Sequence, residues 1–199
     1  MVIKFDHISY SCDMESPDTK AVEGYCLDFE EKQLPNIKAK HDFLQNKSMF
    51  HNISLYRCEG KYPIEITAYP VCTGHNQKYM VSDEVITVNS QCPEETRRFY
   101  EVMGFKKAES GMLELHPFME NRKVVLKVEE SDTGEVFLDK NGFGSLAFVV
   151  DRIEKHKTQL ERNNYSVTEI ETLVVNGKSL RICFAWDNVG DIVEFIGIK

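Results

Sequence analysis

Two glutamates stand in the middle of short apolar runs that are typical of buried strands. Glu65 lies in the sequence I-E-I and Glu194 lies in V-E-F. An unpaired charge in such a strand costs roughly several kcal/mol, so each carboxylate requires a metal ion, a basic partner, a proton or water at an open sheet face. If burial raises its pKa, either carboxylate can instead serve as a proton-transfer base, the route expected for an isomerase or epimerase.

The elements that must position these glutamates follow a repeated order. Residues 83–130 predict a β-α-β-β-β order, and residues 143–199 repeat it. The first 76 residues form a third, less regular copy, with a strand over 2–11 and a helix over 18–32. Residues 34–47 are too polar to be assigned to an element. Glu65 and Glu194 then occupy the closing strands of the first and third copies.

The helix of the second copy has the clearest local signals. Pro93 suits the first helical position, and Gly104 can close the helix as the residue past its end. One face carries the spacing i, i+3, i+4 and i+7: Thr96, Phe99, Tyr100 and Met103. This face is interpreted as core.

Charge and hydropathy exclude some partners. The formal charge of −8 and the scattered basic residues argue against a nucleic-acid-binding surface, which requires clustered Lys and Arg. No segment approaches the roughly 18 uninterrupted apolar residues of a membrane span. We therefore expect a cytoplasmic protein without a membrane anchor, whose partner is a small-molecule substrate or ligand.

Three segments of the second and third copies resemble the vicinal oxygen chelate superfamily. They are V-I-T-V-N-S-Q-C-P-E-E-T-R-R-F-Y-E-V-M-G-F from Val85, G-S-L-A-F-V-V from Gly144, and W-D-N-V-G-D-I-V-E-F-I from Trp186. The resemblance implies an α+β fold in which repeated βαβββ modules form curved mixed sheets around a pocket. It further implies that residues 83–130 and 143–199 pair as a glyoxalase-like domain, after a divergent N-terminal module (1–76) and a linker (77–82).

The resemblance also implies a chemistry. Relatives such as glyoxalase I, extradiol dioxygenases and bleomycin-resistance proteins place ligands on the opening and closing strands of paired modules. A divalent metal there binds vicinal substrate oxygens as a Lewis acid. In the 83–199 pair, Ser145 stands where His is common, and Asp83 or Glu84 is the nearest candidate on the first opening strand.

The N-terminal module supplies what that pair lacks. His7, in F-D-H-I-S-Y, resembles the opening-strand ligand, and Glu65 resembles the closing-strand one. If this module faces the third, His7, Glu65 and Glu194 converge as a mixed N/O site suited to Fe, Mn, Ni, Co or Zn. A homodimer that supplies the missing half is the other arrangement.

Two functions follow from the resemblance. The first is a metal-assisted lyase, isomerase or dioxygenase acting on a small oxygen-rich substrate, with Glu65 and Glu194 as catalytic groups. The second is a metal-free protein that binds or sequesters a small molecule, as bleomycin-resistance proteins do. His51, at the start of an apolar strand, and Trp186 are candidate substrate contacts in either case, with burial beside the sheet as the alternative for Trp186. For His7 the alternative is a strand histidine that is hydrogen-bonded to a neighbour.

Overall fold

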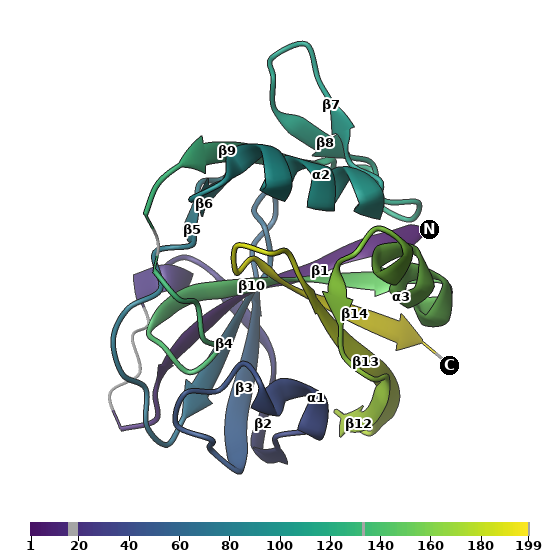
Figure 1. Cartoon of the computed structure of the whole chain (residues 1–199). Helices are drawn as coiled ribbons and strands as arrows, with labels where there is room; N and C mark the ends of the chain where they lie inside the picture. Colours follow the sequence, from purple (N-terminus) through teal and green to yellow (C-terminus); the bar gives the residue numbers. More distant parts are fainter. Residues whose placement is uncertain (16–19, 133, 199) are drawn as a thin grey trace.

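The computed structural model describes residues 1–15, 20–132 and 134–198, and its strands form two sheets (Figure 1). The first module contributes these strands: β1 (Val2–Asp13), β2 (Cys26–Pro35), β3 (Phe50–Arg57) and β4 (Ile64–Tyr69). Their order is β1-β4-β3-β2, with β4 parallel to β1. A 3-10 turn, η1 (Lys20–Val22), precedes β2, and a short helix, α1 (Lys38–His41), precedes β3.

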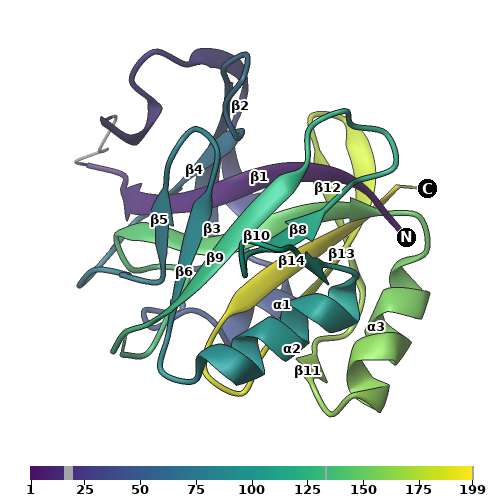
Figure 2. The ribbon, with the colours of Figure 1, turned by 90° about the horizontal axis from the view of Figure 1, so that it is seen from above.

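The third module repeats this order around a longer helix. Its elements are β10 (Gly142–Val150), α3 (Ile153–Arg162), β11 (Ser166–Val167), β12 (Glu171–Val175), β13 (Lys178–Trp186) and β14 (Ile192–Ile198). The order is β10-β14-β13, with β14 parallel to β10 and with both β11 and β12 paired to β13. Strands β1 and β10 pair in antiparallel fashion and join the two modules into one nine-stranded sheet (Figure 2).

The second module forms a separate five-stranded sheet. Its elements are β5 (Tyr79–Val81), β6 (Ile86–Ser90), α2 (Pro93–Met103), β7 (Lys106–Lys107), β8 (Leu113–Leu115) and β9 (Val124–Glu130). The main core lies between this module and one face of the large sheet, and includes Phe5, Ile8, Phe99, Leu126 and Phe148. The other face of the large sheet is concave and faces α1 (Figure 1).

The predicted α+β class with repeated modules is confirmed, and the structure gives the strand pairing that the sequence left open. The hydrogen-bonded edge joins the first and third modules, from Val2 opposite Val150 to Ser11 opposite Gly142, and not the second and third. Strands β1 and β10 are long, with 12 and 9 residues, whereas β6 has 5 and is already covered by β5 on one edge. The division at residues 77–82 stays a prediction.

The helix predicted over 18–32 is wrong where the structure describes it. Residues 20–22 form one 3-10 turn and residues 26–35 form β2, while residues 18–19 lie outside the described part. Pairing with β3 and packing of Phe29 and Leu34 against Ile53 override the helix preference of the E-E-K-Q run.

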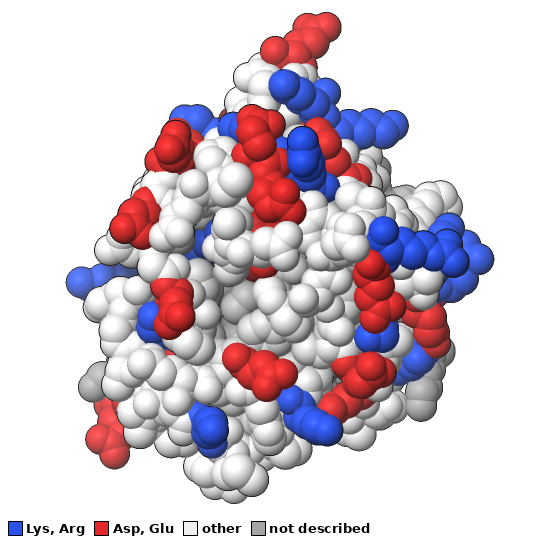
Figure 3. Space-filling view, viewed as in Figure 1, with Lys and Arg blue, Asp and Glu red and all other residues white. Residues whose placement is uncertain are grey.

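Acidic and basic side chains are interspersed on the face shown in Figure 3, without a continuous basic area. Within the described residues, no helix has the length and hydropathy of a membrane span, and the longest, α2, has 11 residues.

Candidate active site

The β1–β10 pairing places three candidate residues in one sheet: His7 on β1, Glu65 on the adjacent β4, and Glu194 on β14, which is separated from β1 by β10. Ser9 of β1 is opposite Glu65 of β4, so His7 and Glu65 are neighbours on one face. On the other side of β1, His7 is opposite Ala147 of β10, which is opposite Glu194 of β14. The distance from His7 Nε2 to Glu65 Oε1 is 3.7 Å.

A β-bulge sets the orientation of His7. The register of β1 shifts between Phe5 and His7, so one extra residue, Asp6, is inserted there. Asp6 Oδ2 lies 3.0 Å from His7 Nδ1, which holds the ring with Nε2 directed toward Glu65. His7 is 3% exposed, and its Nε2 has no hydrogen-bond partner.

The carboxylates around His7 decide its charge. Burial alone lowers the pKa of His7, but the Glu65 charge and the Asp6 hydrogen bond outweigh it and raise the pKa from 6.5 to about 9. For Asp6, burial opposes ionisation, but His7 and Lys4 outweigh it and hold the pKa well below its usual range. Without a metal, His7 is therefore a cation between two carboxylates at neutral pH.

The pKa of Glu194 is shifted in the opposite direction from that of Asp6. Burial raises its pKa from 4.5 to about 7, against the opposing attraction of His7 and Lys40, and the like charge of Glu65 adds to the increase. The side chain is only partly buried, so solvent reaches it. A carboxylate with this pKa exchanges protons near neutral pH, which is the property required of a general base.

A row of hydroxyl groups lies beside the charged residues. Thr67 donates a hydrogen bond to Glu65 Oε1 at 3.0 Å, and its hydroxyl is 3.1 Å from that of Ser9. Ser145, opposite Ser9 on β10, is also buried. The position at which the family has a ligand thus carries a hydroxyl that extends this polar row.

Lys40 is a residue of this site that the sequence analysis did not identify. It lies on α1, in the segment that could not be assigned, and α1 faces the concave side of the sheet (Figure 1). Burial lowers the pKa of Lys40, while the charges of Glu194 and Glu65 act in the opposite direction. Only the position of α1 against β13 brings this ammonium near the glutamates; no spacing in the sequence indicates it.

His51 lies next to Lys40 and not next to His7. Its Nε2 is 3.4 Å from Lys40 Nζ, and its ring stacks on Tyr69 at 5.7 Å. Burial, together with the charge of Lys40, lowers the pKa of His51 to about 2, so the ring is neutral. Its Nδ1 is buried without a hydrogen-bond partner, which leaves one free polar atom at this end of the site.

Trp186 lies at the end of β13 on the apolar part of the same face. Its indole packs edge-to-face on Phe43 at 5.0 Å, in a cluster with Phe184 and Ile192. Its half-buried side chain forms part of the contact between α1 and the sheet.

The residue types at this site, one histidine and two glutamates, are ones that bind divalent metals in proteins. A histidine that ligates a metal usually has its other ring nitrogen held by a carboxylate, as Asp6 holds His7 here. The unpartnered Nε2, with Glu65 and Glu194, gives one nitrogen donor and carboxylate oxygens. In the part of the chain that the structure describes, however, no three His, Cys, Asp or Glu side chains stand close enough to hold a metal as they are.

Comparisons with known proteins return structural neighbours only. No family model matches the chain, and no curated protein matches it. Glyoxalase I from Zea mays is 13% identical, with 98% of this chain and 68% of that chain covered and a TM-score of 0.41. A hypothetical protein from Bacillus halodurans is 13% identical, with 98% and 94% covered and a TM-score of 0.44. A putative dioxygenase from Bacillus subtilis is 11% identical, with 98% and 63% covered and a TM-score of 0.39.

These neighbours have the vicinal oxygen chelate fold that the sequence resembles. An integron cassette protein from a sewage-outfall metagenome is 22% identical and matches 57% of this chain with 96% of its own, at a TM-score of 0.40. Because the identities and TM-scores are low, no activity, ligand or metal is transferred from these proteins to the chain.

Proposed function

We propose that this chain is an enzyme of the glyoxalase-like type that moves a proton on a small, oxygen-rich substrate bound at the concave sheet face. The reaction class is a metal-assisted lyase or isomerase, with Glu194 as the base. The observation that carries the proposal is the buried Nε2 of His7, which lies 3.7 Å from Glu65 Oε1 and on which the charge of Glu194 also acts.

The residues of the site have separate roles in this proposal. Glu194 takes the proton, because its pKa, raised to about 7 by burial, matches neutral conditions. Lys40 and the hydroxyl groups of Ser9 and Thr67 orient substrate oxygens and favour negative charge that develops on them. Asp6 holds His7 in one orientation.

A divalent ion would be held by His7 and Glu65, with Glu194 as a further carboxylate ligand only while it does not carry the proton. When bound, it would act as a Lewis acid on the substrate oxygens. Fe, Mn, Ni, Co and Zn all accept this mixture of donors. Because burial is outweighed by carboxylates that raise the pKa of His7 to about 9, binding must release a proton, so metal affinity falls as the pH falls.

The catalytic test follows proton exchange. Exchange of the α-hydrogen of 2-hydroxy ketones and 1,2-dicarbonyl adducts in deuterated water is measured by NMR, with each of the five metals added. We expect exchange by the native chain and a loss of about 10²–10⁴-fold in Glu194→Gln. Exchange that is unchanged in Glu194→Gln contradicts the assignment of the base.

The metal test needs no substrate. Protein purified without a histidine tag should bind about one divalent ion per chain, and His7→Ala should remove it. His116→Ala is the matched control, because the side chain of His116 is 74% exposed. Stoichiometric metal that survives the loss of both His7 and Glu65 contradicts the ligand assignment.

One observation favours the second function, metal-free binding of a small molecule. Lys40 supplies a cation toward Glu65 and Glu194, which compensates the charge that a metal would otherwise neutralise. This alternative predicts a rise in Tm with an aromatic or amphipathic ligand in the presence of a chelator, and no exchange activity. The exchange assay and the metal analysis together decide between the two functions.

Two further predictions from the sequence stay predictions. The first module supplies the partner strands of the third within one chain, so a homodimer is not required to complete the sheet. Sedimentation of the purified protein measures the oligomeric state. The cytoplasmic location is an expectation to be checked by fractionation.

A further inference from the structure

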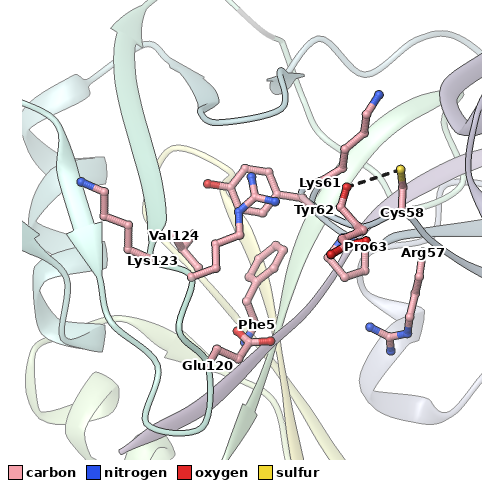
Figure 4. A pocket seen from close by; sticks show the side chains of 11 residues that line it. Phe5, Arg57, Cys58, Lys61, Tyr62, Pro63, Glu120, Lys123 and Val124 are labelled. Carbon is pink, nitrogen blue, oxygen red and sulfur yellow. Dashed lines mark hydrogen bonds between the residues drawn. The ribbon is translucent and has the colours of Figure 1, made fainter.

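A cavity of about 350 Å³ lies away from the concave face, between the first and second modules. Phe5, Tyr62, Pro63 and Val124 line its apolar part (Figure 4). Phe5 belongs to the main core, on the opposite face of β1 from His7, because the bulge at Asp6 separates them. The cavity is thus independent of the proposed active site.

Tyr62 is a fixed platform in this cavity. It is 2% exposed, its hydroxyl donates to the carbonyl of Glu84 at 2.9 Å, and the same hydroxyl accepts from the backbone N–H of Val125 at 3.1 Å. The guanidinium carbon of Arg122 lies 4.0 Å from the centre of the Tyr62 ring. A cation–π contact at this distance keeps the guanidinium against the Tyr62 ring.

One N–H group of the Arg122 guanidinium lacks a hydrogen-bond partner among the described residues. Its Nη2 donates to the carbonyl of Asp83, whereas its Nη1 is buried and has no hydrogen-bond partner. No ion pair joins Arg122 to a carboxylate among the residues that the structure describes. An unpaired charged donor at such a position is costly unless a ligand satisfies it.

The other cations of the cavity already have partners. Lys61 pairs with Asp83 at 3.3 Å, Lys123 with Glu114 at 2.6 Å, and Arg57 with Asp28 at 2.8 Å. Lys61 and Lys123 also extend away from the Phe5 ring (Figure 4). Arg122 is therefore the cation that remains to bind an anion.

We infer that this cavity binds a small aromatic carboxylate, with the carboxylate beside the guanidinium of Arg122 and the ring against Phe5, Tyr62 and Val124. A single negative charge suits the site better than two, because Glu59 and Glu120 also line the cavity. Burial raises the pKa of Glu120, while the backbone N–H of Phe5 and the charge of Lys4 act in the opposite direction. The volume is at the lower end of the range of ligand pockets, about 300–1,000 Å³.

The test uses phenylacetate, phenyl phosphate and benzyl alcohol as ligands in calorimetric titrations. A ligand of this size should bind with a Kd on the order of 1 mM, with phenylacetate ahead of both analogues. Arg122→Gln should weaken phenylacetate at least about tenfold, because it removes a charge-assisted hydrogen bond. The matched control, Lys123→Gln, changes the neighbouring cation and should bind within about twofold of the native chain.

A second measurement does not depend on the folding of a variant. Cys58 lines the cavity and is half-buried, whereas Cys72, also half-buried, lies elsewhere. Phenylacetate at saturation should slow alkylation of Cys58 by iodoacetamide and leave Cys72 unchanged, as read by peptide mass spectrometry. Glu194→Gln should preserve both effects, which separates this inference from the proposed function.

Several results overturn the inference. They are the absence of saturable binding up to about 10 mM phenylacetate, equal affinity in a folded Arg122→Gln variant, and alkylation of Cys58 that phenylacetate does not slow. Equal or tighter binding of benzyl alcohol also contradicts it, because the carboxylate would then contribute nothing.

Discussion

Two buried polar clusters in this molecule each contain an acidic side chain with a raised pKa, but only one is open to solvent. Burial raises the pKa of Glu194 to about 7 on the concave face and the pKa of Asp191 to about 6 between the second and third modules. Glu194 is partly exposed, whereas Asp191 is 0% exposed. A raised pKa alone therefore does not identify an active site, because the group must also be accessible to solvent and substrate.

The contacts of the closed cluster explain its role. Tyr79 of the second module donates a hydrogen bond to Asp191, and Thr96 of the same module donates to Asp187 at 2.6 Å. Lys78 is 0% exposed and its charge opposes the rise in the Asp191 pKa. These contacts connect the second module to the turn before β14, so we interpret the cluster as structural.

The largest expected effect is the loss of stability on substitution in the closed cluster, which contains Asp191 and Lys78. Asp191→Ala leaves Lys78 buried without its compensating charge and should lower the free energy of unfolding by about 3–5 kcal/mol. Glu194→Ala, in the open cluster, should cost less than about 1 kcal/mol, because burial already disfavours its charged form. Urea unfolding at pH 7 measures both. Equal costs would remove the distinction between the clusters.

The second prediction concerns His7 and pH. Its folded pKa, about 9, exceeds the unfolded value of 6.5, since the Glu65 charge and the Asp6 hydrogen bond outweigh burial. The charged ring therefore stabilises the fold fully below pH 6.5, and this contribution is lost as the pH rises through 9, by up to about 3 kcal/mol. Unfolding at pH 6, 7.5 and 9 should show this loss in the native chain and not in His7→Gln.

Glu194→Gln is the control for the pH experiment. Burial raises the Glu194 pKa from 4.5 to about 7, so its effect on stability falls in a lower window, below pH 7. The variant should keep the loss between pH 6.5 and 9. A native chain whose stability is constant across that range contradicts the charge assigned to His7.

The third prediction concerns Lys40. Lys40→Met removes a cation that acts on Glu65 and Glu194. The affinity for Mn²⁺ or Zn²⁺ should rise about tenfold, because the metal no longer competes with the ammonium for the carboxylates. Lys38→Met on the exposed side of α1 is the control and should leave the affinity unchanged. Weaker metal binding in Lys40→Met would mean that Lys40 supports the metal site.

The smallest effect is expected at Trp186. Trp186→Phe weakens the edge-to-face contact with Phe43 and should cost about 1 kcal/mol of stability. Metal affinity should stay within about twofold, since Trp186 is assigned to the apolar part of the concave face. A larger change in metal affinity would place Trp186 in the metal site.

The sequence predicted much of the fold and part of the site. Glu65 and Glu194 stood out because a charge in an apolar strand requires compensation, and β-branched runs indicated most strands. The edge that pairs was not predictable, because β1, β6 and β10 are all apolar and local pattern does not rank their partners.

The lysines show the physical limit of local patterns. Lys40 and Lys78 both lie in polar segments that are typical of surface loops, yet Lys78 is fully buried and Lys40 faces the glutamates. Their burial depends on contacts with β13 and with the turn before β14, far away in the chain. Asp6 was missed because only the bulge turns its side chain toward His7.

The most direct measurement is an NMR pH titration of the protein with ¹³C-labelled Glu and His side chains, without metal. Glu194 should titrate near 7 and His7 near 9, each through burial and neighbouring charges, and Glu65→Gln should lower the pKa of His7. Titration of Glu194 near 4.5 and of His7 near 6.5, with no response to Glu65→Gln, would show that the three side chains do not share a site.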